Sequence, residues 1–431
     1  MTASPAAASD RRRDAAHPVS IDPGAPHILG SALACHRDLG SEASVGYHYL
    51  EFLARRYRVT ALAAPPSMAP PGVRLVPCNA GPCQLNDVDP LSLMRFESNQ
   101  LRLALLGRAG RFDVVHRLTP AAISIPSLAP LLRRPLVIGP LIAAPAPPAS
   151  FAPILRSPPR PTLSERLRPR RIVASVARRA SDYLRKTEFA VSRAVLILVG
   201  MEEARRQVPE SVRRHCVPIT WCGVEHRHFV PPDARPEGAP LKLLFVGRLV
   251  PYKGIELLLQ AMRVAQQRCS LHLRIVGDGD AEYVAYLKQL VATAGLADTV
   301  SFEGSVPRSQ LAGYYRAADV FCFPTLADTY GVALLEAMSS GCAVVASRTG
   351  GPAELVKDDR GMTIPLTDPE RFVAEYAAAL VTLAGNVDLR RRLGAGARRY
   401  VVQEHDWERI GARFLEIYDS FVSGLALGAR A

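Results

Sequence analysis

The sequence predicts an α/β protein with two doubly wound domains, each built on a parallel sheet covered by helices on both faces. Three observations support this fold class. Short apolar, strand-like segments alternate with helix-periodic segments in both halves of the chain. Such alternation is typical of parallel strands joined by helical crossovers. The length of 431 residues is enough for two or three domains with their own cores.

The C-terminal half has the clearer pattern and begins with the apolar run LKLLFV, which ends at Gly247. Its strand ends carry loops rich in glycine, proline or charge, and ligands of parallel sheets bind at such ends. Gly341 stands where a glycine typically ends a helix. The GDGD segment at 277–280 is a weak glycine signal that a tight turn also explains. Strands are expected at 241–246, 271–276, 300–304, 319–324, 343–347 and 361–365, and helices at 255–267, 281–294, 310–317 and 331–340.

The N-terminal half repeats the alternation less regularly. Strands are expected at 27–33, 58–63, 112–116, 134–140 and 194–200, with a helix at 43–56 and helical segments at 386–402 and 405–425 near the C-terminus. Proline-rich stretches at 144–161 and 230–240 indicate a loop and a linker. The expected organisation is a disordered tail at 1–22, an N-terminal domain at 23–228, a linker at 229–240, a second domain at 241–400 and a C-terminal helix at 401–431, for which packing back on the N-terminal domain is one arrangement.

Composition excludes several classes of protein. No apolar run approaches the 18 residues of a membrane-spanning helix, and the first twenty residues lack the apolar core of a signal peptide. The eight cysteines form no C-x-x-C pair, so neither a zinc site nor a disulfide framework is indicated. A reducing, cytoplasmic setting is therefore expected.

The net charge of +13 is concentrated in one part of the chain. Residues 151–190 hold ten Arg or Lys and three acids, a net of +7. The basic segment 156–186 has an apolar face made of Ile172, Val173, Val176, Ala180, Tyr183 and Leu184. This face is expected either to pack on its own domain or to lie on an inner-membrane surface. No aromatic interleaving accompanies the basic residues, so nucleic acid is not an expected partner.

Residues typical of a sugar-nucleotide site follow the strand at 241–246. A diphosphate is bound by cations and helix N-termini, because negative charge grows on it as the sugar leaves. Gly247, Arg248 and Lys253 lie in a strand–loop–helix turn that offers both. Taken alone, Lys253 would be a solvated lysine at a helix start, and Arg248 could cap a helix or pair with an acid. Their joint position at a strand end favours a binding role.

Two carboxylates and a helix start complete this group of residues. Asp328 and Glu336 stand on either side of the start of the helix near Gly331 and Val332. Carboxylates accept hydrogen bonds from paired sugar hydroxyls, and the amides at a helix start bind phosphate. Glu336 lies in an apolar helix, where a charge needs a partner. Asp328 could instead be an acid near a helix N-terminus.

The ordered motifs GRLVPYKG, VGDGD, FEGSV, DTYGVALLEAMSSGCAVVAS and GGPAELV resemble the donor domain of glycosyltransferase family 4. The N-terminal half is similar more loosely, through LGSEASVGYHYLEFLARRYRVTALA, FDVVHRLTP and LVIGP. This resemblance implies the GT-B fold, in which two Rossmann-like domains face a central cleft. It also implies a retaining enzyme that uses a sugar nucleotide and requires neither a metal nor another cofactor.

The resemblance also implies a role for each matching residue. Arg248 and Lys253 would bind the diphosphate, Glu336 the ribose, Asp328 the transferred sugar and Val306 the nucleobase, while Gly40 and Ser41 would face the phosphates and His116 the anomeric centre. A histidine at this position is also explained as a hydrogen-bonded core residue. The family pattern has glutamate where this chain has Asp328, and a glycine-rich run where Pro140 is followed by LIAAPAPPAS. These two departures affect the sugar and acceptor contacts.

The expected function is therefore transfer of a sugar from a UDP- or GDP-sugar, UDP being the commoner donor, to a glycan, lipid-linked or small-molecule acceptor. Such reactions belong to polysaccharide synthesis, including lipopolysaccharide or exopolysaccharide. Two alternatives remain open. One is a nucleotide-sugar epimerase or hydrolase of the same fold. The other is a non-catalytic, membrane-associated scaffold of a glycan-assembly complex. The expected location is the cytoplasm, with peripheral attachment to the membrane if the basic segment binds there.

Overall fold

The computed structural model describes residues 21–79, 90–123, 125–143, 145–155, 189–233, 240–357 and 359–428. Residues 1–20 of the expected tail at 1–22 lie outside these residues, and so does the basic segment 156–186. Contacts divide the chain into two units. Unit 1 comprises Met1–Pro120, Ser127–Val137 and Phe414–Ala431, and unit 2 comprises Ala121–Pro126 and Ile138–Arg413. The segment 241–400, expected to be one domain, falls within unit 2.

The first sheet has seven strands in the order β3-β2-β1-β4-β5-β6-β7. Its strands are β1 (His27–Ala32), β2 (Arg58–Ala63), β3 (Val73–Pro77), β4 (Val114–Thr119), β5 (Leu136–Leu141), β6 (Leu196–Val199) and β7 (Cys216–Pro218). Strand β1 pairs in parallel with both β2 and β4. Five of these strands were expected from the sequence. The short strands β3 and β7 were not, because each is partly exposed and lacks a long apolar run.

Helices α1 (Gly40–Ala54) and α2 (Pro90–Leu105) belong to unit 1. The helix α1 begins earlier than the expected residue 43. The helix α2 was not expected from the sequence, although its apolar residues follow a helical period. The short helix α6 (Glu202–Gln207), which lies in unit 2, was also missed.

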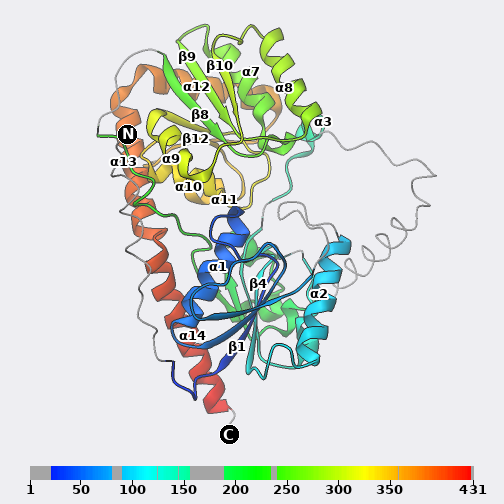
Figure 1. Cartoon of the computed structure of the whole chain (residues 1–431). Helices are drawn as coiled ribbons and strands as arrows, with labels where there is room; N and C mark the ends of the chain where they lie inside the picture. Colours follow the sequence, from blue (N-terminus) through cyan, green and yellow to red (C-terminus); the bar gives the residue numbers. More distant parts are fainter. Residues whose placement is uncertain are drawn as a thin grey trace, which may run out of the picture. The chain divides into compact units, whose positions relative to one another are not determined.

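The second sheet has six parallel strands in the order β10-β9-β8-β11-β12-β13. Figure 1 labels β8, β9, β10 and β12 of this sheet. Its strands are β8 (Leu241–Val246), β9 (Leu271–Val276), β10 (Val300–Gly304), β11 (Val320–Phe323), β12 (Ala343–Ser347) and β13 (Met362–Ile364). All six were expected at nearly these positions. Parallel strands that are buried on both faces need uninterrupted apolar runs, and such runs can be recognised in the sequence.

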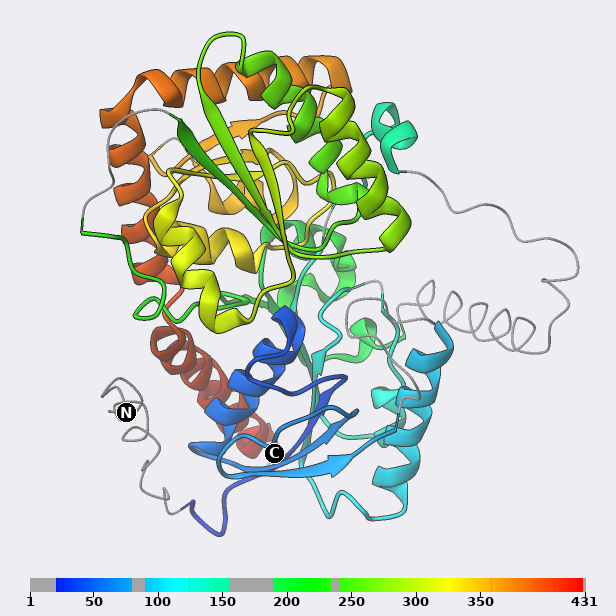
Figure 2. The ribbon, with the colours of Figure 1, turned by 45° about the horizontal axis from the view of Figure 1, so that its top comes forward.

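The helices of this region surround the second sheet (Figure 2). They are α7 (Ile255–Ala265), α8 (Ala281–Thr293), α9 (Arg308–Ala317), α10 (Val332–Ser339), α11 (Gly350–Leu355), α12 (Pro369–Gly385) and α13 (Val387–Glu404). Gly341 has a φ of 69°, as expected for the glycine that follows a helix. Neither α11 nor α12 was expected. The start of α12 is nevertheless marked by Asp368, whose side chain accepts a hydrogen bond from the Arg371 amide.

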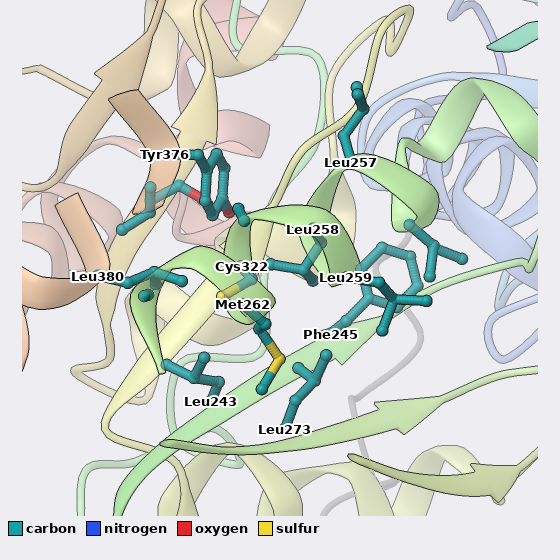
Figure 3. Packing of buried hydrophobic residues seen from close by; sticks show 14 of the residues in the cluster. Leu243, Phe245, Leu257, Leu258, Leu259, Met262, Leu273, Cys322, Tyr376 and Leu380 are labelled. Carbon is teal, nitrogen blue, oxygen red and sulfur yellow. The ribbon is translucent and has the colours of Figure 1, made fainter. Parts of the chain in front are cut away.

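The core of this region lies between α7, α12 and the strands. Met262 of α7 lies between Leu243 and Leu273, and Tyr376 approaches from α12 (Figure 3). The Tyr376 hydroxyl donates a hydrogen bond to the Val345 carbonyl at 2.8 Å. Burial of these apolar side chains is the main stabilising contribution here, at about 25 cal/mol per Å² of apolar surface.

A proline-rich segment expected to be a loop contributes to the same core. It forms a 3-10 turn at Ala149–Phe151 and the short helix α3 (Ala152–Leu155). The Phe151 side chain is fully buried and meets the Phe372 ring edge-on, with 6.1 Å between ring centroids. A part of the expected N-terminal domain therefore packs into the hydrophobic core of the second sheet.

The C-terminal helix α14 (Trp407–Gly428) brings aromatic side chains into unit 1. The ring of Phe414 meets Tyr49 at 4.8 Å, and the ring of Tyr418 meets Tyr57 at 5.5 Å. Among the described helices, none alone is long and apolar enough to cross a membrane; α12 and α13 pass that test only together, across a bend of 105°. The described cysteines are all free thiols, and Cys83 lies outside the described residues.

Candidate functional site

The order of the second sheet reverses between β8 and β11, which are neighbours although two strands separate them in sequence. The loops that leave such a pair turn to opposite sides and open a crevice at the carboxyl ends of the strands. The expected diphosphate-binding loop follows β8, and the expected sugar-binding loop follows β11. The sheet order therefore brings these two loops together.

The loop after β8 ends in a 3-10 turn, Pro251–Lys253, and then Gly254 at a φ of 70°. A Cβ at Gly254 would lie 2.0 Å from the Pro324 carbonyl oxygen, so no other residue fits. The Leu326 amide donates to the Tyr252 carbonyl at 2.7 Å. These contacts bind the loop after β8 to the start of the loop after β11 and fix the position of Lys253.

The backbone of the GDGD segment packs against the backbone of the same loop. A Cβ at Gly277 would lie 1.9 Å from the Gly247 carbonyl oxygen, and one at Gly279 would lie 2.1 Å from the Leu249 carbonyl oxygen. The Leu249 amide donates to the Asp278 carbonyl at 2.9 Å. The glycines are therefore needed for close approach between two backbones, which is more than a tight turn requires.

Lys253 and Asp328 meet across the point where the sheet order reverses. The Lys253 ammonium forms an ion pair and hydrogen bond with the Asp328 carboxylate. Their side chains are only 14% and 13% exposed, so water screens this pair less than a surface pair. The same ammonium lies 5.2 Å from the centroid of the Phe323 ring.

Arg248 provides the second cation of the loop. Its side chain is exposed, and its Nη2 atom donates to the Tyr252 hydroxyl at 2.5 Å. The guanidinium carbon of Arg248 lies 5.9 Å from the centroid of the Tyr252 ring, and the Lys253 ammonium lies 5.6 Å from it. The two expected cations thus converge on one aromatic ring, which favours positive charge at its face.

Helix α10 begins at this same place. Gly331 precedes it with a φ of 98°, and a Cβ there would lie 3.1 Å from the Phe323 ring. Since Lys253 contacts that ring as well, the ammonium and the start of α10 are close to each other. Gly331 has no side chain with which to cap the amides that follow it, such as that of Val332. Such a helix start favours an anion.

Glu336 lies further along α10 and is only 3% exposed. Its Oε1 atom pairs with the Arg308 guanidinium at 3.0 Å, and its Oε2 atom accepts a hydrogen bond from the Tyr315 hydroxyl at 3.0 Å. Burial raises the pKa of this carboxyl, while Arg308 and Tyr315 oppose the shift. Burial and the neighbouring carboxylate raise the pKa of Tyr315 well above its usual value, which keeps its hydroxyl protonated as a donor.

Arg308 and Tyr315 were not identified from the sequence. Arg308 opens α9, close behind Val306, which is half-buried in the loop after β10. The sequence offers one indication of such partners: a buried carboxylate such as Glu336 requires a cation or hydrogen-bond donors nearby. The sequence did not indicate which of 48 arginines would supply that cation.

The expected site residues of unit 1 have different surroundings. Gly40 and Ser41 form the first turn of α1. His116 was expected at the end of a strand, but β4 continues to Thr119, so that premise was wrong. The His116 side chain is fully buried and stacks on Tyr418, with 5.5 Å between ring centroids. These are the contacts of a core residue. In the described part of the chain, no group of His, Cys, Asp or Glu is arranged to hold a metal ion.

Comparison with known proteins gives a family match in the second half of the chain. Residues 240–386 match the family model described as "Glycosyl transferases group 1". The D-inositol 3-phosphate glycosyltransferase of Streptomyces scabiei is 33% identical over 221 residues, covering 47% of this chain and 48% of that protein. The phosphatidyl-myo-inositol mannosyltransferase of Mycobacterium tuberculosis is 35% identical over 195 residues, covering 43% and 50%. The chain thus spans about half the length of these curated relatives.

Solved structures resemble nearly the whole chain. Sucrose-phosphate synthase from Thermosynechococcus elongatus aligns with a TM-score of 0.65 and 21% identity, covering 93% of this chain and all of that one. The Anabaena HepE protein, solved with UDP and glucose, aligns with a TM-score of 0.61 and 17% identity, covering 92% and 100%. These likenesses define the class: the chain has the GT-B fold. Within that class, residues 240–386 are similar to the glycosyl transferases group 1 family.

Proposed function

We propose that this chain is a glycosyltransferase whose nucleotide-sugar donor binds at the carboxyl ends of the second sheet. The observation that carries the proposal is the ion pair between Lys253 and Asp328 beside the start of α10 at Gly331. This arrangement lies where the sheet order reverses, which is the usual ligand position in such folds. The family match over residues 240–386 supports the same assignment.

The diphosphate is the part of the donor whose negative charge the site has to neutralise. Lys253 and Arg248 supply two positive charges, and the amides after Gly331 supply a helix start. A bound diphosphate draws the Lys253 ammonium away from Asp328 and leaves that carboxylate available to accept hydrogen bonds from the sugar. Breaking of the bond between the sugar and the phosphate oxygen adds charge to the diphosphate, and these groups stabilise it.

The nucleoside would lie toward β10. Glu336 is held by Arg308 and Tyr315, and an ionised carboxylate has about four acceptor positions, of which these contacts use two. The others are available to the ribose hydroxyls. Val306 would contact the base. UDP is our first choice of nucleotide, because the Anabaena HepE protein was solved with UDP and glucose.

The transfer step forms a bond between the acceptor oxygen and the anomeric carbon on the face that the diphosphate leaves. The bond from the anomeric carbon to the phosphate oxygen breaks, and the acceptor proton passes to that oxygen. The anomeric configuration is retained. In this proposal residues 241–400 form the donor domain and 23–228 the acceptor domain, with 229–240 as the linker. Glycan synthesis at the cytoplasmic face of a membrane suits this reaction, although the basic segment 156–186 lies outside the described residues.

A panel of UDP- and GDP-sugars tests the proposal. The chain should bind one of them in calorimetry and hydrolyse it slowly without an acceptor. Lys253→Ala and Glu336→Ala should each weaken donor binding by about 100-fold, which corresponds to roughly 3 kcal/mol. Lys242→Ala, at the opposite end of β8, and Glu282→Ala, on α8, are the matched controls.

Each result separates the alternatives. Unchanged donor binding in both site variants would reject the assigned site. An absence of binding by any nucleotide sugar would favour the non-catalytic scaffold. Product analysis with and without acceptor distinguishes transfer from epimerisation or hydrolysis, because only transfer makes a new glycosidic bond.

A further inference from the structure

The strand order of the second sheet arranges the proposed donor contacts along one edge. Val306 follows β10, Lys253 follows β8 and Asp328 follows β11, and these strands lie in the order β10-β9-β8-β11-β12-β13. Base, diphosphate and sugar therefore lie along this edge in the order in which they are joined in the donor. The next positions, at the ends of β12 and β13, lie beyond the sugar.

A cavity of about 420 Å³ lies at the ends of β12 and β13. One wall comes from Arg348, Thr349 and Gly350 after β12, and from Pro365 and Leu366 after β13. The same wall contacts the proposed sugar loop. A Cβ at Gly350 would lie 2.2 Å from the Asp328 carbonyl oxygen, and the Gly351 amide donates to that oxygen at 3.4 Å. The cavity is thus adjacent to the loop that would hold the transferred sugar.

Charged groups of both signs line the cavity. Glu202, Glu203 and Glu354 provide three carboxylates, and Arg206 and Arg348 provide two guanidinium groups. Side chains of this kind suit a ligand with many hydroxyls, because carboxylates accept and guanidinium groups donate hydrogen bonds. A volume of this size lies within the range of small-molecule sites.

The same groups disfavour an anionic ligand. The Glu354 carboxylate accepts hydrogen bonds from the amides of Glu202 and Glu203, at 3.3 and 3.4 Å, so a protein carboxylate already occupies the start of α6. The Arg206 guanidinium lies 3.7 Å from the Glu203 carboxylate and is partly neutralised by it. With three acids against two cations, a phosphate group would meet net negative charge.

We infer that this cavity is the acceptor subsite and that it takes a neutral, hydroxyl-rich saccharide unit rather than a phosphorylated one. The inference rests on the proposed function, which supplies the direction from diphosphate to sugar. In the cavity, the acceptor hydroxyl approaches the anomeric carbon past the Asp328 loop.

The experiment compares neutral and phosphorylated probes on the full-length chain. Methyl α-glucoside, methyl α-mannoside and methyl α-galactoside are each added with the donor that the chain hydrolyses, and glucose 6-phosphate and mannose 6-phosphate form the second arm. Nucleotide release and the glycosylated product are both measured. At least one neutral probe should be glycosylated, at a rate exceeding that of either phosphate by about tenfold or more. Preference for the phosphorylated arm would overturn the inference.

Variants test the named side chains. Glu203→Gln should lower the ratio of transfer to donor hydrolysis by about tenfold, the effect of losing one hydrogen bond to a charged group. Glu203→Asp should recover part of this loss. Glu210→Gln, exposed on the next turn and outside the cavity lining, is the matched control. An unchanged ratio in Glu203→Gln would overturn the inference.

Direct binding separates this inference from the proposed function. Saturation-transfer NMR with the methyl glycosides needs neither a donor nor catalysis. The neutral probes should give signals that weaken in Glu203→Gln and persist in Glu210→Gln, even if no nucleotide sugar is hydrolysed. Equal signals from both variants would reject the cavity as their site. Failure of every donor together with variant-sensitive glycoside binding would reject the proposed transfer reaction while leaving a saccharide site.

Discussion

Removal of Arg308 tests the network that holds the buried carboxylate of α10. The Glu336 side chain is 4% exposed and has Arg308 as its cationic partner at 3.0 Å, while the Arg308 side chain is 35% exposed. Loss of one partner from a fully buried ion pair costs about 3–5 kcal/mol. Because water reaches the Arg308 side of this pair, we expect Arg308→Leu to lower the free energy of unfolding by about 1–3 kcal/mol at pH 8.

The pH dependence of this loss follows from the direction of the Glu336 pKa shift. Burial raises the pKa of the folded carboxyl above its usual value of 4.5, and Arg308 is the largest opposing influence. Without Arg308 the folded pKa rises further. The folded state then binds more protons than the unfolded state above pH 4.5, so stability falls as pH rises toward the folded pKa. The penalty of Arg308→Leu should therefore be small near pH 4.5 and grow as the pH rises.

Urea unfolding of wild type, Arg308→Leu, Glu336→Gln and the double variant between pH 5 and 8 measures this prediction. In the Glu336→Gln background, the pH-dependent part of the loss should disappear, because no carboxylate remains to be ionised. Arg263→Leu, an exposed change on α7, serves as the control. A penalty that is the same at every pH, or that survives unchanged in the double variant, would refute the reasoning.

Three further predictions concern other parts of the site and its surroundings. Lys253→Met leaves the largely buried Asp328 carboxylate without its ammonium partner, so unfolding free energy should fall by about 1–3 kcal/mol in urea, and an unchanged value would contradict the desolvated pair. Gly277→Ala places a Cβ 1.9 Å from the Gly247 carbonyl oxygen and should lower the thermal midpoint strongly. The control is Gly313→Ala on α9, whose Cβ would meet nothing within 4 Å and which should raise the free energy of unfolding by about 1 kcal/mol. Equal effects of the two variants would argue against the close backbone approach at Gly277. His116→Ala removes a ring stacked on Tyr418 and should cost about 2–4 kcal/mol in urea unfolding, and wild-type stability would reject its place in the core of unit 1.

Much of the second sheet could be predicted from residues alone. Strands β8, β11 and β12 are buried along nearly their whole length, so their apolar runs appear directly in the sequence. Segments that depend on a partner for burial were harder to recognise. The half-exposed strand β3 and the amphipathic helix α2 have mixed composition, and Phe151 stands among prolines that indicate a loop.

The sequence by itself determined the alternation of strands and helices and the chemical character of the loops at the strand ends. It also indicated Lys253, Asp328 and Glu336 as site residues, because charged residues beside apolar segments require a partner or a ligand. These features can be predicted from local sequence, because burial on two faces and turns in the chain determine the residue types within a few positions.

Only the tertiary structure decided which of those residues meet. The Lys253–Asp328 pair joins positions 75 residues apart, and Arg308 reaches Glu336 from another helix. The cavity at the ends of β12 and β13 likewise collects side chains from α6 and from loops far along the chain. These long-range contacts depend on the spatial order of the strands. That order results from the packing of the crossover connections over the whole sheet, so no single position in the sequence indicates it.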